Sequence, residues 1–180
     1  MIRTFDGQTP RIDPSAFIAE TAYIIGDVEI GPGSSVWPGA VIRGDFAPIR
    51  IGSGTHIEDN TVVHTCMPLD IGDNVTVGHG VVIHCRRIGN RCLIGNNATL
   101  LDGAEIGDGC IVAAGAVVTP RTQVPPGSFV AGVPGEVRGP ASETSRGRGR
   151  NLAEGPRPTG GGYADLIRRY KEQGLDSPRD

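Results

Sequence analysis

The chain has few aromatic residues and no long apolar run. Aromatic side chains make up 4% of its 180 residues, with a single tryptophan, although apolar residues reach 38%. A core is therefore expected, built mainly from small aliphatic side chains. No apolar stretch approaches the roughly 20 residues of a membrane span, and the first residues do not resemble a signal peptide. These absences predict a cytoplasmic protein without a membrane partner.

A strong positive charge is also missing. The formal net charge is −3, with 9 basic and 14 acidic residues in the first 140 and 8 basic and 6 acidic residues in the last 40. This acidic body argues against nucleic acid as a partner. The 28 glycines and 14 prolines follow no Gly-X-Y period, which excludes a collagen-like chain.

The most regular feature of the sequence is a six-residue period. Branched apolar residues recur at this spacing from Ile12 to Val130, and glycine often follows them directly. A period of six fits neither a helix nor a simple amphipathic strand. It predicts a solenoid of short strands with a turn every six residues.

Interruptions of this period predict the number of faces. The spacing becomes nine after Ile42, eight after Val63 and five after Ile83, and three hexads separate successive interruptions. A coil that changes length only at every third hexad has three faces, so one turn takes about eighteen residues. We therefore expect a three-faced β-solenoid over residues 1–140, with turns stacked about 4.8 Å apart like paired strands.

The period ends after Val130, and two further segments are expected. Residues 141–162 are rich in Gly, Arg, Ser and Pro, which indicates a linker or a poorly ordered arm. Over 163–175 the apolar residues Tyr163, Leu166 and Tyr170 have helical spacing, and Gly174 can end a helix. This short amphipathic helix should dock on the solenoid or on a neighbouring subunit.

The four histidines all lie within 29 residues. In the predicted register, Arg43, His64 and His84 each follow the leading residue of the third face, so they should form a column on successive turns. The stacked pair His64 and His84 could bind one divalent metal ion. A surface ladder without metal is the alternative. His56 falls outside this column and is expected at the surface.

His79 is expected on the second face, before the corner that leads to His84. From there it should not reach the ion bound by the other two histidines. A neighbour related by threefold symmetry could supply it, which predicts a homotrimer with metal sites at its interfaces. Glu58 and Asp59 should stack below Gly78 and His79.

The four cysteines have two expected settings. Cys92 and Cys110 occupy small inward positions on adjacent turns, which indicates core thiols and not a disulfide. Cys66 and Cys85 lie near the histidines, so a mixed His/Cys metal site stays open at this point, although these two cysteines do not stack.

Three segments together carry a family resemblance. They are Val41-Ile42-Arg43-Gly44-Asp45, Ile57-Glu58-Asp59-Asn60-Thr61-Val62-Val63-His64 and Gly78-His79-Gly80-Val81-Val82-Ile83-His84. In order and spacing they resemble the gamma-class carbonic anhydrase family, in particular its compact bacterial members of the YrdA and PaaY type. The resemblance covers residues 10–138.

The resemblance implies a fold, a site and a reaction. The fold is a left-handed parallel β-helix of hexapeptide repeats that forms a homotrimer. His64 and His84 of one subunit and His79 of the next would bind Zn²⁺, or Fe²⁺ or Co²⁺, and Arg43 would pair with Asp45 across the interface. The metal-bound hydroxide of such a site converts carbon dioxide to bicarbonate. Glu58 and Asp59 would orient the water or accept its proton.

Three departures from the family pattern bear on function. Glu58 stands where the family usually has Gln, and a short segment, residues 65–70, replaces a long acidic loop that carries a proton shuttle. The C-terminal helix resembles the family only over residues 163–170, from which Tyr163 is expected to reach the site.

Three other functions follow from the same features. A metal-dependent acyl-CoA thioesterase would use the same site, and a non-catalytic trimer would use the metal for assembly alone. An acyltransferase is suggested by the hexapeptide repeat and by Gly132-Val133-Pro134 at its end.

Overall fold

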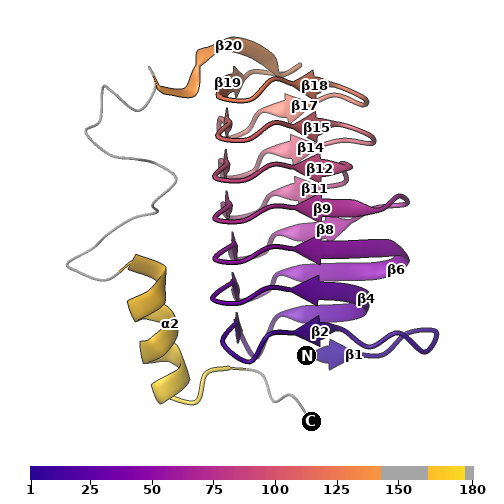
Figure 1. The fold of residues 1–180 in the computed structure, drawn as a ribbon, viewed down its shortest axis with the longest axis vertical. Coiled ribbons are helices and arrows are strands. Elements are labelled where there is room, and N and C mark those ends of the chain that lie inside the picture. Colours follow the sequence, from indigo (N-terminus) through magenta and orange to yellow (C-terminus); the bar gives the residue numbers. More distant parts are fainter. Residues whose placement is uncertain (143–161, 177–180) are drawn as a thin grey trace.

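The protein folds as a stack of parallel strands with a helix beside it. A computed structural model describes residues 1–142 and 162–176. In Figure 1 the strands form successive turns of a solenoid, and helix α2 lies next to the turns nearest the N-terminus. The linker or arm expected at 141–162 falls almost entirely outside the described residues. None of the described helices is long and apolar enough to cross a bilayer.

The solenoid has three faces, as the interrupted hexads predict. Face 1 contains β2 (Arg11–Ile12), the second part of β4 (Tyr23–Ile30), the second part of β6 (Val41–Ile51), β9 (Leu69–Ile71), β12 (Arg87–Ile88), β15 (Glu105–Ile106) and β18 (Gln123–Val124). Face 2 contains β3 (Phe17–Ile18), β5 (Ser35–Val36), β7 (His56–Ile57), β10 (Thr76–Val77), β13 (Leu93–Ile94), β16 (Ile111–Val112) and β19 (Ser128–Ala131), followed by the antiparallel β20 (Glu136–Pro140). Face 3 contains β1 (Ile2–Arg3), the first parts of β4 and β6, β8 (Val62–His64), β11 (Val82–Ile83), β14 (Thr99–Leu100) and β17 (Val117–Val118).

The leading residue of each hexad points inward and stacks on its counterpart in the next turn. On face 3, for example, Ile42 pairs in register with Val63, and Val63 pairs with Ile83. All three are completely buried, as are Ala40, Thr61 and Val81, the smaller residues that stand two positions before them. The predicted parallel β-helix of hexapeptide repeats is therefore confirmed, because the same six-residue period now accounts for the core of every turn.

Helix α2 spans Gly162–Glu172, so it ends three residues before the expected limit of 175. Gly174 has φ +68, its N–H bonds to the Lys171 carbonyl, and the Leu175 N–H bonds to the Tyr170 carbonyl. This pair of bonds is the Schellman motif, in which a glycine in the left-handed conformation closes the last helical turn. The glycine was therefore correctly placed as the end signal, but the helix stops before it.

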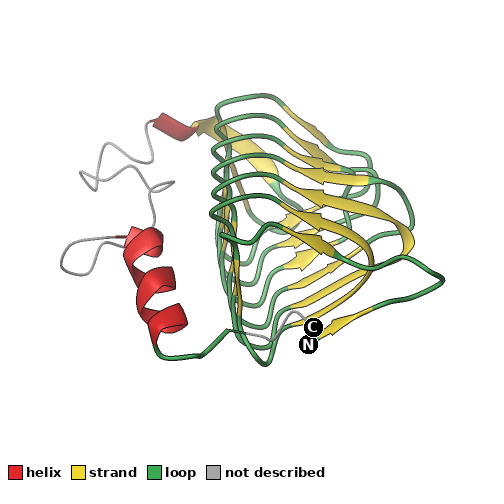
Figure 2. Ribbon diagram, turned by 60° about the horizontal axis from the view of Figure 1, so that its bottom comes forward, coloured by secondary structure: helices red, strands yellow, loops and turns green. Residues whose placement is uncertain are grey.

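The helix packs against the first turns of face 2. The Tyr170 ring lies 5.5 Å from that of Phe17 and 5.2 Å from that of Trp37, both nearly perpendicular to it. The Lys171 ammonium donates to the carbonyls of Pro14 and Ser15. Figure 2 shows the same helix outside the solenoid and not within it. The prediction that it docks on the solenoid is met within a single chain.

The outward side chains differ from face to face. On face 1 they form a ladder of alternating charge, in register from turn to turn: Arg11, Glu29, Arg50, Asp70, Arg87 and Glu105. On face 3 they are mostly β-branched and apolar: Val41, Val62, Val82, Thr99 and Val117. Face 2 carries helix α2. The three faces thus share one kind of core and have three different surfaces.

Candidate metal site

Two histidines stack at the edge of face 3. His64 is the last residue of β8, and His84 directly follows β11, the next strand of the same face. Their ring centroids lie 5.5 Å apart with 56° between the ring planes. Arg43 precedes them in the same column, since it pairs in register with His64. The predicted column of Arg43, His64 and His84 is therefore present.

Each histidine of this pair has its own carboxylate partner. The His64 Nε2 lies 3.0 Å from the Asp45 Oδ1, and the His84 Nδ1 lies 3.0 Å from the Asp102 Oδ1. Asp45 also pairs with Arg43 of the same chain. One nitrogen of each ring is thus engaged by a carboxylate, which leaves the other nitrogen of each ring for a further partner.

The spacing of this pair suits a zinc ion. Two imidazoles bound tetrahedrally with Zn–N bonds of about 2.0–2.1 Å have centroids about 5 Å apart. The observed 5.5 Å is close to this value without any backbone change. Metal-bound histidines are usually oriented by a carboxylate or carbonyl that contacts the ring nitrogen not bound to the metal, and each ring here has such a carboxylate. The residues present therefore fit a zinc ion, with a third ligand still to be supplied.

His79 lies at the corner between faces 2 and 3. We expected it within face 2, but β10 already ends at Val77 and His79 is in the turn that follows. The two flanking glycines explain this position. A Cβ on Gly78 would lie 3.0 Å from the Asn96 backbone nitrogen, and Gly80 has φ +67, which side chains rarely adopt. The Gly-His-Gly segment therefore makes the tight corner and presents the imidazole outward.

His79 belongs to a second cluster of polar side chains. Its Nδ1 lies 3.0 Å from the Asp59 Oδ2, and its Nε2 lies 2.8 Å from the Glu58 Oε2, while 55% of the side chain stays exposed. The predicted stacking of Glu58 and Asp59 below Gly78 and His79 is thus confirmed. Burial raises the pKa of Glu58, an effect that nearby Asp59 reinforces and His79 opposes.

Tyr163 brings helix α2 into this cluster. Its hydroxyl donates a hydrogen bond to the Glu58 Oε1. Its ring stacks on the His56 ring, with centroids 3.9 Å apart and 24° between the planes. His56, expected at the surface and not as a ligand, faces outward and is partly covered by Tyr163. The His56 Nδ1 also lies 2.8 Å from the Ser35 hydroxyl, and burial lowers the pKa of His56 to about 4.

The two clusters stay separate within one chain. We call His64, His84, Asp45 and Asp102 the histidine pair with its carboxylates, and His79, Glu58, Asp59 and Tyr163 the His79 cluster. Among residues 1–142 and 162–176, no three His, Cys, Asp or Glu side chains are placed to bind one metal ion. The expectation that His79 does not reach the ion of its own chain agrees with this geometry.

The cysteines do not join either cluster. Cys85 is completely buried, and burial raises the pKa of its thiol to about 12. Cys66 is exposed in the short segment that follows His64. A mixed His/Cys site therefore finds no support in the described part of one chain. Cys92 and Cys110 are free and completely buried on adjacent turns, as expected of core thiols.

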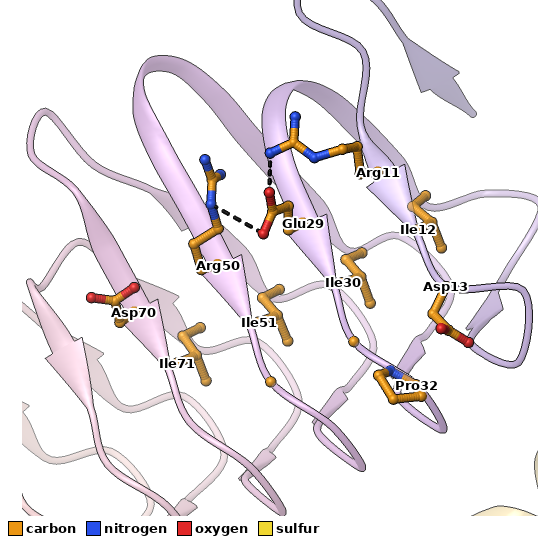
Figure 3. A pocket seen from close by; sticks show the side chains of 12 residues that line it. Arg11, Ile12, Asp13, Glu29, Ile30, Pro32, Arg50, Ile51, Asp70 and Ile71 are labelled. Carbon is orange, nitrogen blue, oxygen red and sulfur yellow. Dashed lines mark hydrogen bonds and ion pairs between the residues drawn. The ribbon is translucent and has the colours of Figure 1, made fainter.

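A groove on face 1 is lined by the charge ladder and is separate from both clusters. Arg11, Glu29, Arg50 and Asp70 stand along it, and Gly31 and Gly52 also line it. Figure 3 shows Glu29 between the two guanidinium groups, both of which pair with it. Arg50 also bonds Asp27 at 2.8 Å. The charges of the first three turns thus neutralise one another.

Two side chains near the histidine pair were missed from the sequence. Asp102 lies one turn above His84, and counting hexads places Leu101 above His84 in register, so its neighbour could have been found this way. Phe46 is 72% exposed, and its ring stands edge-on to His64 with centroids 5.7 Å apart. Nothing in the hexad period predicts its position, because it belongs to the insertion within β6.

Comparisons with known proteins agree with this fold. A family model for the bacterial transferase hexapeptide (six repeats) matches residues 9–44 and 87–120. A crystal structure of a hexapeptide transferase family protein from Anaplasma phagocytophilum superposes with a TM-score of 0.83 at 37% identity, over 94% of this chain and 98% of that one. The chain is therefore a hexapeptide-repeat β-helix protein.

Sequence relatives identify the family within this fold class. The chain is 56% identical over 128 residues to a probable carbonic anhydrase of Methanocaldococcus jannaschii, which covers 70% of this chain and 80% of that protein. It is 44% identical over 142 residues to the mitochondrial gamma carbonic anhydrase 2 of Arabidopsis thaliana, over 74% of this chain and 51% of the relative. The chain thus spans about half the length of this plant relative. It belongs to the gamma-class carbonic anhydrase family.

Proposed function

We propose that this protein is a metal-dependent carbonic anhydrase whose sites form between the subunits of a homotrimer. The observation that carries the proposal is the separation of the two clusters. A pair of stacked imidazoles has no third ligand among the described residues of its own chain, while a third imidazole stands exposed at the corner of the solenoid before His84. A threefold axis beside face 3 would bring the His79 cluster of one subunit to the histidine pair of its neighbour.

The surface of face 3 supports such an assembly. Val62 and Val82 stand two residues before His64 and His84 and are 38% and 40% exposed. Val41, Thr99 and Val117 extend this column over five turns. An apolar stripe beside a polar site is typical of an interface between subunits. Face 1, with its charge ladder, and face 2, with its helix, have no comparable stripe among the described residues.

Three neutral imidazoles would bind the metal, with zinc as the first candidate and iron or cobalt as alternatives. Bound there, the metal supplies a Lewis acid that lowers the pKa of water toward neutrality. The reaction would be the reversible hydration of carbon dioxide to bicarbonate. In this arrangement Asp45 and Asp102 orient the two stacked rings, and Asp59 orients His79 through its Nδ1.

Glu58 would accept a proton at the site, and Tyr163 would position Glu58. Because they accompany His79, they would reach the neighbour's histidine pair together with it. Burial raises the pKa of Glu58, so its Oε2 can accept a proton nearer neutrality than an ordinary carboxylate can. The Tyr163 hydroxyl donates to the other oxygen, while Oε2 lies 2.8 Å from the His79 Nε2. A neutral Gln at this position could not take up the proton.

Subunit mixing tests the interface directly. The variant His79→Ala keeps the histidine pair, and the double variant His64→Ala/His84→Ala keeps His79. Each alone should lack tight metal binding and carbon dioxide hydration. After unfolding and refolding together at equal amounts, about one interface in four would combine the intact halves of both variants. Stopped-flow hydration assays should then recover activity in proportion, with metal content measured on the same samples.

The outcomes separate the parts of the proposal. Recovery of both metal and activity supports the shared site. An active His79→Ala homotrimer would refute the role of His79. A wild-type protein that is filled with zinc, cobalt or iron and still hydrates no carbon dioxide would refute the carbonic anhydrase and leave a metal used for assembly or for another hydrolysis.

A second candidate is the hydrolysis of an acyl thioester at the same metal site. The exposed Phe46 ring beside His64 favours it, because an apolar surface next to the site can bind an acyl chain. Hydration of carbon dioxide does not require such a surface. Hydrolysis rates measured over a series of acyl-CoA lengths decide between them. Rates that rise with chain length and fall in Phe46→Ala support the thioesterase, and flat, negligible rates dispose of it.

The acyltransferase reading has weaker support from the site. The family model and one solved relative are described as transferases. That chemistry does not account for the two stacked imidazoles and their carboxylates. The cytoplasmic location likewise stays a prediction.

A further inference from the structure

Asp102 stands beside the candidate site but lies outside the three segments that define the family resemblance. It occupies the turn that follows β14, one turn of the solenoid above His84. Its Oδ1 lies 3.0 Å from the His84 Nδ1. Of the two ring nitrogens, this contact engages the one nearer the backbone.

The turn that carries Asp102 is held by its neighbours. The Ala104 N–H bonds to the Leu101 carbonyl, and the Arg121 N–H of the next turn bonds to the Asp102 carbonyl at 2.8 Å. Gly103 adopts φ +67, as this tight corner requires. Hydrogen bonds within this turn and to the next turn therefore hold the backbone of Asp102, and this backbone position places the carboxylate next to His84.

We propose that Asp102 is a positioning residue that holds His84 in the Nδ1–H tautomer, so that its Nε2 faces the metal. The Asp102 Oδ1 lies 3.0 Å from the His84 Nδ1, and a carboxylate oxygen accepts hydrogen bonds, so the Nδ1–H form of the ring is the one that can donate to it. In the neutral ring the other nitrogen is then the lone-pair donor, as metal ligation requires. This inference rests on the proposed metal site and extends it by a residue from a turn that carries no metal ligand.

The role of Asp102 differs from that of Asp45 at the other ring. Asp45 is shared between His64 and Arg43, and its side chain is only 15% exposed. Asp102 is 62% exposed, and among the described residues His84 is its one side-chain ion-pair partner. Removing Asp102 should therefore perturb His84 alone, whereas removing Asp45 would also release a guanidinium group.

The test compares zinc affinity in two variants and a control. Asp102→Ala removes the acceptor, Asp102→Asn keeps an acceptor oxygen without the charge, and Asp70→Ala removes an exposed aspartate on face 1. Competition with a chromogenic zinc chelator at pH 7.5 gives each dissociation constant. We expect zinc binding about 10- to 100-fold weaker in Asp102→Ala, as is usual when a group that orients a metal-bound histidine is removed. Asp102→Asn and Asp70→Ala should stay within about threefold of wild type.

The tautomer of His84 gives a readout that needs neither metal nor activity. Long-range ¹H–¹⁵N spectra of the zinc-free, ¹⁵N-histidine-labelled protein distinguish Nδ1–H from Nε2–H rings. The wild type and Asp102→Asn should show His84 as the Nδ1–H form, and Asp102→Ala should lose that preference. This measurement on the wild type stands even where a variant fails to fold.

Several results would overturn the inference. They are an Nε2–H tautomer at His84 in the wild type, unchanged zinc affinity in Asp102→Ala, or an Asp102→Asn variant as weak as Asp102→Ala. Failure of the proposed function is recognised differently. A zinc-filled wild type that hydrates no carbon dioxide would refute the carbonic anhydrase, while the affinity differences among the Asp102 variants would still decide the role of this residue.

Discussion

Faces 1 and 3 have the same interior and opposite exteriors. Inward, both present one completely or almost completely buried branched residue per turn, such as Ile106 on face 1 and Leu100 on face 3. Outward, face 1 presents alternating charges, while face 3 presents valines and, at its edge, the stacked histidines. The hexad period therefore specifies the inward residues of the core and does not specify the outward residues that differ between the faces. Function depends on the residues that the period leaves free.

The largest expected contrast is in metal binding. His64→Ala should weaken zinc binding at least about 100-fold, because it removes one of two stacked imidazoles. Arg50→Ala, at an outward position of face 1, should leave zinc affinity unchanged. Chelator competition measures both. Equal loss in the two variants would mean that the substitutions act through stability and that the faces do not differ in this function.

The interiors should respond alike. Leu100→Ala on face 3 and Ile106→Ala on face 1 each leave a cavity in a fully packed core, which should lower the free energy of unfolding by about 2–5 kcal/mol. Denaturant unfolding of metal-free protein gives both values. A core that tolerates one substitution far better than the other would contradict the equivalence of the two faces.

Face 2 carries a histidine, His56, whose burial by helix α2 makes docking of the helix depend on pH. The pKa of His56 falls from about 6.5 to about 4 because Tyr163 and the solenoid bury it. As pH falls from about 6.5 to about 4, His56 becomes protonated when the helix is undocked but stays neutral when the helix is docked. Docking of helix α2 should therefore weaken as pH falls from about 6.5 to about 4, by at most about 3 kcal/mol.

The single tryptophan reports this change. Trp37 packs against both Tyr163 and Tyr170 of the helix, so its fluorescence should shift as the helix leaves. His56→Asn keeps a polar side chain next to Ser35 and cannot titrate in this range. A pH profile identical in wild type and His56→Asn would show that another group controls docking.

The smallest effect is expected from the charge ladder. Arg50→Ala breaks ion pairs with Asp27 and Glu29 on a solvent-facing surface, and such pairs contribute under about 1 kcal/mol. The loss should shrink further at high salt. Denaturant unfolding at two salt concentrations measures it. A loss comparable with that of Leu100→Ala would show that the outward ladder of face 1 is as important as the core.

Most of the fold could be predicted from the sequence, because the register of a solenoid follows from counting. The column of His64 and His84 and the pairing of Asp59 with His79 were found in this way. Counting failed where the chain leaves the period. It placed His79 within a face, although two glycines turn the chain there, and it could not show that a helix 107 residues later partly covers His56.

The third ligand of the metal site could not be predicted from the sequence for a different reason. A count along one chain can place His79 near His84 in sequence and still cannot say which copy of the chain it serves. The geometry of one chain keeps the two apart. The subunit-mixing experiment is therefore the measurement that completes the site.

The corner between face 3 and face 1 is where this solenoid changes length. From Ile12 to Val130 the spacing between leading residues is six at the other two corners, but at this corner it is nine after Ile42, eight after Val63 and five after Ile83. His64 and His84 stand where these variable loops begin. The leading core residues on either side of these loops keep their register although the loops differ in length. The rim of the site can be lengthened, shortened or exchanged by evolution or by a designer, while the scaffold that aligns the imidazoles stays the same.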